Sequence, residues 1–169
     1  CAGKISAGAD GLIQLPYIAG ERTPINDPEA KGVLFGLTLK HTRNHLYRAA
    51  LESVGYTIRQ HLDIFTENGI KFKRIYAVGG GTKSSDWLQI IADITDCEIC
   101  RADVSVGASF GDALMAAIGI GEIKSFSSLR ALIRPETCFT PNQDNRDIYD
   151  KYQKIYTQLY SVTSGLMHQ

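Results

Sequence analysis

The fold of this 169-residue chain is decided by one stretch, Ala77-Val78-Gly79-Gly80-Gly81-Thr82-Lys83-Ser84-Ser85-Asp86-Trp87. The run that leads into it, residues 75–78, is apolar, of strand length and rich in β-branched and aromatic side chains. Three consecutive glycines remove every Cβ, so the backbone can adopt left-handed dihedrals and a ligand can approach its amides. Ser84 or Ser85 can cap a helix whose apolar residues recur at helical spacing through residue 95. The stretch therefore predicts a buried strand, a glycine turn and a helix.

A glycine turn that opens onto a helix N-terminus favours a phosphate-bearing ligand, because free amides and the positive end of the helix dipole meet there. Two familiar nucleotide motifs do not fit this turn. A P-loop needs a glycine directly before its lysine, whereas Thr82 precedes Lys83. The dinucleotide fingerprint G-x-G-x-x-G has Ser84 at its third glycine position. A tight turn that binds no ligand stays open as an alternative.

Composition limits the classes of protein to consider. The chain is 44% hydrophobic, which is enough for one core and fits a single domain or most of one. Eighteen basic residues balance 18 acidic ones, so we expect no nucleic-acid or membrane partner. No apolar run approaches the length of a membrane span, and no charged-then-apolar leader is seen. The first residue is Cys1 rather than methionine, which we interpret as the mark of a fragment or a processed chain.

The four cysteines, Cys1, Cys97, Cys100 and Cys138, do not resemble the disulfide framework of a small secreted protein. Cys97 and Cys100 form a C-x-x-C pair within a segment that reads as a strand. Strand residues three apart face opposite sides of a sheet, so these two sulfurs could not share one metal ion. We therefore expect reduced cysteines in a cytoplasmic protein.

Two histidines, His41 and His45, are four residues apart and could lie on one helix face as zinc ligands do. Neither has the adjacent glutamate of an H-E-x-x-H motif, and no third ligand is evident. We expect solvated or packing histidines near the start of a helix.

Strands and helices alternate along the chain, which fits a layered α/β domain. We expect strands at residues 11–18, 33–39 and 75–78 and at Cys97, and a loop at 135–145. We expect helices at residues 43–67, from Ser85, at 107–119 and from Ile148 onward. The longest helix should bury a stripe formed by Leu46, Ala50, Val54, Ile58, Leu62 and Phe65.

Two other helices carry informative patterns. The small residues of 107–119 would let that helix lie very close to a sheet or another backbone. The last helix carries an aromatic stripe, including Tyr149, Tyr152 and Tyr156, which is typical of a docking face.

Further residues settle which α/β family the chain resembles. Gly32-Val33-Leu34-Phe35-Gly36-Leu37, then seven residues, then His45-Leu46-Tyr47-Arg48-Ala49-Ala50-Leu51-Glu52 resembles a signature of the FGGY carbohydrate kinases, with every fixed position satisfied. That family includes xylulokinase, gluconate kinase and glycerol kinase. Residues 15–24 resemble the loop before the signature, 78–81 its adenosine-binding turn and 107–113 its small-residue helix. The resemblance extends over residues 11–121.

The resemblance implies an actin-like (ribonuclease H-like) ATPase fold of two lobes, with ATP and Mg²⁺ between them, that phosphorylates a sugar or polyol hydroxyl. It places Gly79, Gly80 and Gly81 against the adenosine and α-phosphate side of ATP, and Ser85 near the nucleoside. Trp87 fits a core anchor at least as well as a nucleotide contact. Lys83 fits a phosphate contact or a solvated turn residue. The stretch 21–24 is more similar to the xylulokinase-like members, which act on pentuloses, than to glycerol kinases.

In this family the catalytic aspartate and most sugar contacts belong to the N-terminal lobe, and the phosphate-binding hairpin precedes the segment seen here. We therefore expect residues 1–169 to form one domain, the later portion of an incomplete C-terminal lobe, with the N-terminal lobe absent. Phosphoryl transfer needs groups that this chain then lacks, so no catalytic or metal-binding residue is assigned and the isolated chain should be inactive.

An incomplete lobe would leave a sheet edge and an apolar face uncovered, so we expect pairing with the missing lobe or in a homodimer. Two other functions stay open. One is a non-catalytic actin-fold module that binds a nucleotide and a partner protein. The other is an NAD-type oxidoreductase domain, which the missing third glycine disfavours.

Overall fold

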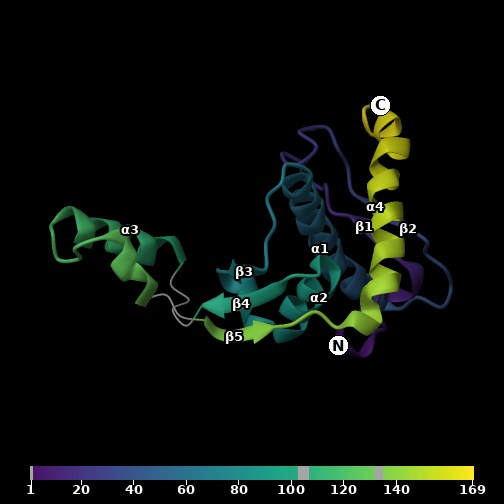
Figure 1. The fold of residues 1–169 in the computed structure, drawn as a ribbon. Helices are drawn as coiled ribbons and strands as arrows, with labels where there is room; N and C mark the ends of the chain where they lie inside the picture. Colours follow the sequence, from purple (N-terminus) through teal and green to yellow (C-terminus); the bar gives the residue numbers. More distant parts are fainter. Residues whose placement is uncertain (1, 103–106, 132–134) are drawn as a thin grey trace.

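The computed structural model describes residues 2–102, 107–131 and 135–169 (Figure 1). Cys1, on which the fragment interpretation rests, lies outside the described residues. The helices are α1 (Arg43–Glu67), α2 (Ser85–Thr95), α3 (Gly107–Gly119) and α4 (Arg146–Met167). The strands are β1 (Ile13–Leu15), β2 (Val33–Phe35), β3 (Arg74–Ala77), β4 (Glu98–Ala102) and β5 (Pro135–Phe139). Within the described ranges, no helix has the length and apolar character needed to cross a membrane.

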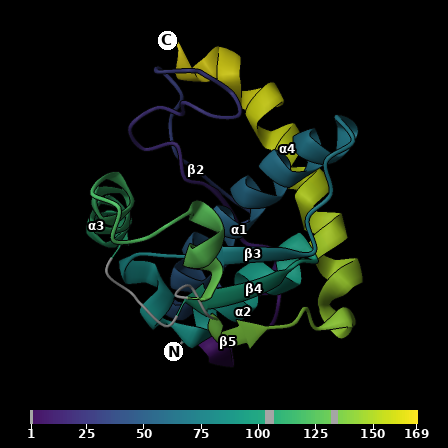
Figure 2. The same cartoon turned by 60° about the vertical axis from the view of Figure 1, so that its left-hand side comes forward.

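The strands form two sheets. β1 and β2 pair antiparallel, with Ile13 opposite Phe35. In the second sheet β3 lies parallel to β4, and β4 lies antiparallel to β5. Because β3 and β4 are parallel, the chain between them must cross over, and α2 is that crossover. Figure 2 shows the three strands side by side, with α4 crossing α1.

The predicted loop at residues 135–145 is wrong in its first half, because β5 occupies Pro135–Phe139. A proline lacks the amide proton that a ladder needs, which makes the segment look like a loop in sequence. Pro135 is tolerated because it is the first residue of the strand and β5 is an edge strand of the described sheet. The predicted strands at 11–18 and 33–39 exist but are shorter, at three residues each.

The longest helix has the bounds that the sequence predicts. At its start, the Nδ1 atom of His45 accepts the backbone amide of Thr42 at 3.1 Å. Four residues earlier, before the helix begins, the Nδ1 atom of His41 accepts the backbone amide of Thr38 at 2.9 Å. The two imidazole rings also meet edge to face, with centroids 5.4 Å apart. These histidines therefore have the packing role that was expected of them. The helix ends before Gly69, which has a φ of 80°.

The face that α1 buries differs from the predicted apolar stripe. Leu46 and Phe65, the two ends of that stripe, are 40% and 43% exposed. The buried face instead consists of Arg48, Ala49, Glu52, Ser53, Gly55 and Tyr56. Hydrophobic periodicity missed this face because two of its members are charged residues that pair with each other. α1 packs closely against α2 here, since a Cβ at Gly55 would lie 2.6 Å from a side-chain carbon of Ile94.

A buried ionic cluster joins three parts of the chain. The Oε1 atom of Glu52 accepts from the Nε atom of Arg48 at 2.7 Å, from the amide of Gly8 at 2.9 Å and from the hydroxyl of Tyr149 at 3.1 Å. A second nitrogen of Arg48 donates to the Tyr149 hydroxyl at 2.8 Å. Burial raises the pKa of Glu52, while the Arg48 charge opposes that rise. The cluster fixes α1 to α4 and to the N-terminal segment.

The aromatic stripe of α4 is a docking face, as predicted. Tyr149 and Tyr156 are fully buried, and Leu159 is nearly so. Tyr56 of α1 lies between the two tyrosines, with ring centroids 6.2 Å from Tyr149 and 5.3 Å from Tyr156. Aromatic pairs at such distances add to the free energy gained by burying their surface. The main core therefore lies between α1, α2, α4 and β1.

The small-residue helix α3 does not have the close contacts expected of it. It stands apart from the sheet in both views (Figures 1 and 2). A Cβ added at Gly111 or Gly119 would meet nothing within 4 Å. Met115 and the nearby Ile120 are 57% and 77% exposed. Its small residues therefore face open space rather than a neighbouring backbone.

The buried ion pair gives a testable prediction for stability. Glu52→Gln removes the negative charge from the buried ion pair between Arg48 and Glu52. Breaking a buried pair in this way costs about 3 kcal/mol or more. Arg74→Gln is the matched control, because Arg74 and its partner Glu98 have side chains that are 46% and 28% exposed and such pairs contribute about 1 kcal/mol or less. Urea unfolding of the two variants measures both costs, and similar small losses would contradict the assigned role of Glu52.

Candidate functional site

The glycine turn lies at the carboxyl end of β3, where the chain leaves the sheet and enters α2. Residues Gly80–Lys83 form a short 3₁₀ helix between the two elements. In open sheets with parallel strands, ligands bind beyond the carboxyl ends of the strands. The turn therefore occupies the edge of the sheet at which a ligand is expected.

The three glycines of the turn serve three different purposes. Gly79 has a φ of 99° and a ψ of −176°, a conformation that side chains rarely allow. Gly80 has ordinary space around it, since a Cβ there would meet nothing within 4 Å. Gly81 gives room to Trp87, because a Cβ there would lie 2.4 Å from the Cζ3 atom of the indole ring. Only Gly79 and Gly80 therefore present backbone that a side chain would otherwise cover.

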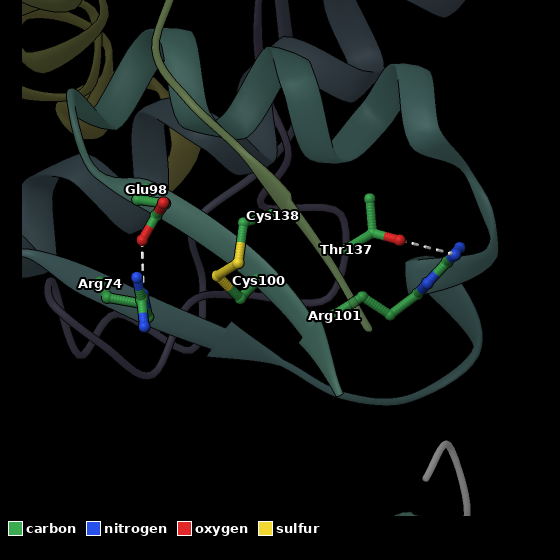
Figure 3. Close-up of a disulfide and its surroundings, with 6 residues drawn as sticks. All are labelled: Arg74, Glu98, Cys100, Arg101, Thr137 and Cys138. Atoms are coloured by element: carbon green, nitrogen blue, oxygen red, sulfur yellow. Dashed lines mark hydrogen bonds and ion pairs between the residues drawn. A yellow bond between two sulfur atoms is a disulfide. The ribbon is translucent and has the colours of Figure 1, made fainter. Parts of the chain in front are cut away.

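The turn is fixed by contacts with its own residues, the sheet and α1. The hydroxyl of Thr82 donates to the carbonyl of Gly79 at 2.7 Å. A guanidinium nitrogen of Arg101, from β4, donates to the carbonyl of Thr82 at 3.4 Å. Arg101 also donates to the hydroxyl of Thr137 in β5 at 3.4 Å (Figure 3). These bonds hold the turn against the sheet.

Trp87 connects the same turn to α1. Its Nε1 atom donates to the carbonyl of Leu51 at 3.1 Å, and its ring lies against Gly81. Trp87 is therefore a structural anchor, which is the role the sequence favoured at least as strongly as nucleotide contact. Leu51 precedes Glu52, so the anchor attaches beside the buried ionic cluster.

The start of α2 confirms Ser84 as the residue that caps the helix. Its Oγ atom accepts the backbone amide of Trp87 at 3.3 Å. Ser85 is then the first helical residue, and its side chain is exposed, as is that of Lys83. Gly79, Gly80 and Ser85 are each exposed, whereas a Cβ at Gly81 would meet the indole ring.

This surface is open rather than enclosed. The clearest cavities among the described residues lie elsewhere, and none of these is lined by Gly79, Gly80 or Gly81. One cavity of about 550 Å³ lies behind α2 and is lined mainly by polar residues, among them Asp93, Asn142 and Asn145. Asp93 accepts the side-chain amide of Asn145 at 2.8 Å and the backbone amide of Asn142 at 2.9 Å, so it serves the structure there. The glycine turn therefore lies on open surface, outside these cavities.

The signature glycines differ in importance. Gly36 has a φ of 86°, and a Cβ there would lie 2.3 Å from the carbonyl oxygen of Gly11. Gly32 has no such constraint, since its nearest neighbour would be 3.4 Å away. A neighbouring backbone therefore passes close to Gly36 and not to Gly32.

The prediction of reduced cysteines is wrong for Cys100 and Cys138, which form a disulfide (Figure 3). The two residues are direct partners across β4 and β5, with Cα atoms 4.1 Å apart. Sequence reasoning missed the pair because it placed Cys138 in a loop. Cys97 is a buried free thiol whose pKa is raised by burial. The cysteines therefore give no support to the expected cytoplasmic location.

Comparison with known proteins identifies similar chains. The family model described as the FGGY family of carbohydrate kinases, C-terminal domain, matches residues 2–120. A xylulose kinase of Staphylococcus epidermidis is 37% identical over 98% of this chain and 34% of its own length. A gluconokinase of Bacillus subtilis is 33% identical over 94% of this chain and 31% of its own length. This chain thus spans about a third of the length of the curated relatives it matches.

Solved structures agree with these matches. The crystal structure of xylulose kinase from Rhodospirillum rubrum matches this chain with a TM-score of 0.83 and 34% sequence identity. The match covers 99% of this chain and 34% of the Rhodospirillum chain. A ligand-bound xylulose kinase from Lactobacillus acidophilus matches with a TM-score of 0.88 and 26% sequence identity. The match covers 96% of this chain and 33% of the Lactobacillus chain. These likenesses confirm the predicted α/β, actin-like fold class of a C-terminal kinase lobe.

The different purposes of the glycines can be tested by alanine substitution. Gly81→Ala forces a methyl group into the Trp87 ring and should cost about 1–3 kcal/mol, as overpacking does. Gly80→Ala is the matched control, because its methyl group enters open space and should change stability by less than about 0.5 kcal/mol. Trp87 is the single tryptophan of the chain, so its fluorescence emission reports directly on the contact. A Gly81→Ala variant with unchanged stability and emission would contradict this account.

Proposed function

Because this chain belongs to the FGGY family of carbohydrate kinases, we propose that the protein containing it transfers the γ-phosphoryl group of ATP to a hydroxyl of a ketose or polyol. The observation that carries the proposal is the family match over residues 2–120. The xylulose kinase relatives, at up to 38% identity, support it. A xylulokinase-like acceptor, a ketopentose, is the substrate we favour.

We further propose that this chain supplies the adenosine side of the ATP site. The support is the surface at Gly79 and Gly80, where a Cβ would fill space that is otherwise open. Aromatic and sugar rings can approach a backbone closely where no side chain intervenes. Ser85 stands beside this surface at the start of α2, where its hydroxyl can bond to a ribose or adenine group. Gly81 contributes indirectly by seating Trp87, which fixes the turn.

We propose that this chain contributes little to binding the ATP phosphates and the metal ion. Mg²⁺ prefers oxygen ligands and is usually held by substrate phosphates with one or two carboxylates. Gly79, Gly80 and Gly81 have no side-chain oxygen to offer, so we propose that Mg²⁺ is held by ATP and by residues outside this chain. The base for the attacking hydroxyl is placed outside the chain in the same way. Lys83 is the nearest positive charge to the turn in sequence and is exposed.

We propose that the exposed sheet edge of this lobe contacts the rest of the kinase. β3 is an edge strand of the described sheet, and beside it Tyr76 and Val78 are 46% and 67% exposed. Exposed apolar residues at a sheet edge favour association. We propose that the remaining part of the protein covers this edge, with homodimerisation as the competing arrangement.

A second acceptor class has specific support. The gluconokinase relatives are 33% identical over 94% of this chain, which is close to the similarity of the xylulose kinases. Gluconate, unlike xylulose, carries a carboxylate, which needs a cationic contact that a neutral ketose does not. That contact is proposed to lie outside this chain, so the chain itself does not separate the two acceptors.

A substrate panel tests the proposal. The full-length protein with ATP and Mg²⁺ should release ADP when D-xylulose is added, with a kcat/KM at least about tenfold above those for gluconate and glycerol. The isolated 169-residue chain should release none, because the phosphate-binding and catalytic groups are elsewhere. The measurement is a coupled assay of ADP formation.

The outcomes of that assay are distinct. Preference for gluconate would keep the kinase assignment and replace the proposed acceptor. ADP release by the isolated chain would contradict the division of the site between two parts of the protein. No acceptor-dependent ADP release by the full-length protein would contradict the kinase assignment.

A further inference from the structure

The face of the β3–β4–β5 sheet that points away from α2 carries three potential metal ligands. Ile99 packs against Leu88 and Ile91 of α2, so its neighbours Glu98 and Cys100 face the opposite side. Cys138 lies directly across from Cys100 on β5. One carboxylate oxygen and the two Sγ atoms all lie within 4.8 Å of one another (Figure 3). Two strands thus bring a Cys, Cys, Glu set together without any loop.

The spacing of the two sulfurs suits a tetrahedral ion once the disulfide is opened. Zn–S bonds of about 2.3 Å at a tetrahedral angle require sulfurs roughly 3.8 Å apart. Residues directly opposite on antiparallel strands have Cβ atoms roughly 4.5–5.5 Å apart. The Cα atoms of Cys100 and Cys138 are 4.1 Å apart, so rotation of the two side chains after the S–S bond opens would move the sulfurs toward the required separation.

The charges of the cluster also balance for a divalent cation. Two thiolates and one carboxylate carry three negative charges. Arg74 of β3 forms an ion pair with the Oε2 atom of Glu98, which adds one positive charge (Figure 3). A divalent ion then brings the sum to zero. Arg74 engages one carboxylate oxygen and leaves the other for the metal, as outer partners of metal ligands commonly do.

We propose that Cys100, Cys138 and Glu98 bind one divalent ion of the zinc class when the disulfide is reduced. Two thiolates and one carboxylate would supply three ligands, and water would supply the fourth. Cys97 is excluded from the site, because it precedes β4 and its Sγ atom lies 3.6 Å from the carbonyl of Phe72. In either state, oxidised or metal-bound, β5 stays attached to β4.

The chemistry of the exchange is balanced. A phosphine reductant attacks the disulfide, the S–S bond breaks, and phosphorus is oxidised to the phosphine oxide with oxygen from water. The two hydrogens of that water protonate the two sulfurs, so both cysteines become thiols. Metal binding then displaces both thiol protons, so each bound ion releases two protons. Reoxidation expels the ion and restores the disulfide only if an oxidant removes two electrons.

Cobalt(II) is a spectroscopic probe for such a site. The full-length protein is reduced with a phosphine without oxygen, and Co²⁺ is titrated into it. The expected result is thiolate-to-cobalt charge-transfer absorption that saturates at one ion per chain. The oxidised protein should show none. Zinc should remove the absorption by displacing cobalt, because zinc binds more tightly to such ligands.

Matched variants assign the ligands. Cys100→Ser and Cys138→Ser should each lose the absorption, whereas Cys97→Ser, which removes the thiol next to β4, should retain it. Glu98→Gln leaves the disulfide and both thiols intact and should weaken cobalt affinity by about tenfold or more. Circular dichroism of each reduced variant shows whether it is folded. Glu98→Gln keeps the test decisive if a cysteine variant is unfolded.

Three results would overturn the proposal. The first is reduced, folded wild-type protein with no thiolate-to-cobalt absorption. The second is absorption that survives in both Cys100→Ser and Cys138→Ser. The third is a Glu98→Gln variant with unchanged affinity, which would remove the carboxylate from the site.

Discussion

The Glu52 carboxylate is buried where α1, α4 and the N-terminal segment meet, and its Oε1 atom accepts from Arg48, Gly8 and Tyr149. A buried charge is costly unless it is paired and hydrogen-bonded, so these three donors are held where the carboxylate requires them. Next to it in sequence, the carbonyl of Leu51 accepts the indole N–H of Trp87. The position of the glycine turn thus follows from the position of α1.

The turn is fixed by contacts with α1 and the sheet. Its exposed backbone can therefore accept a ligand without losing these contacts. Trp87 fills the space at Gly81, and Arg101 ties Thr82 to the sheet. Gly79 and Gly80 then present exposed backbone that no neighbouring side chain covers. A rigid wall of this kind needs an opposing surface before it encloses a nucleotide. The chain spans about a third of the length of its kinase relatives, and we propose that the opposing surface belongs to another part of the protein.

Local signals in the sequence predicted much of the fold, and long-range partners explain the failures. Helix positions and the glycine turn depend on neighbouring residues, so the sequence predicted them closely, and it limited the cap of α2 to Ser84 or Ser85. The buried face of α1 depends on Gly8 and Tyr149, distant in sequence, and charged residues resemble a solvated face when their partners are unknown. The disulfide depends on the register of β5, which no local pattern specifies. The candidate site residues were placed by family resemblance, and their contact with a nucleotide stays a prediction.

The most direct test of the central claim is a kinetic measurement on Gly80→Val in the full-length protein. The valine side chain would enter the open space in front of the turn without touching the core, so the unfolding midpoint should not change. The account predicts a rise in KM for ATP of about tenfold or more, equivalent to about 1.4 kcal/mol, with KM for the sugar unchanged. An unchanged KM for ATP, or a rise confined to the sugar, would contradict it.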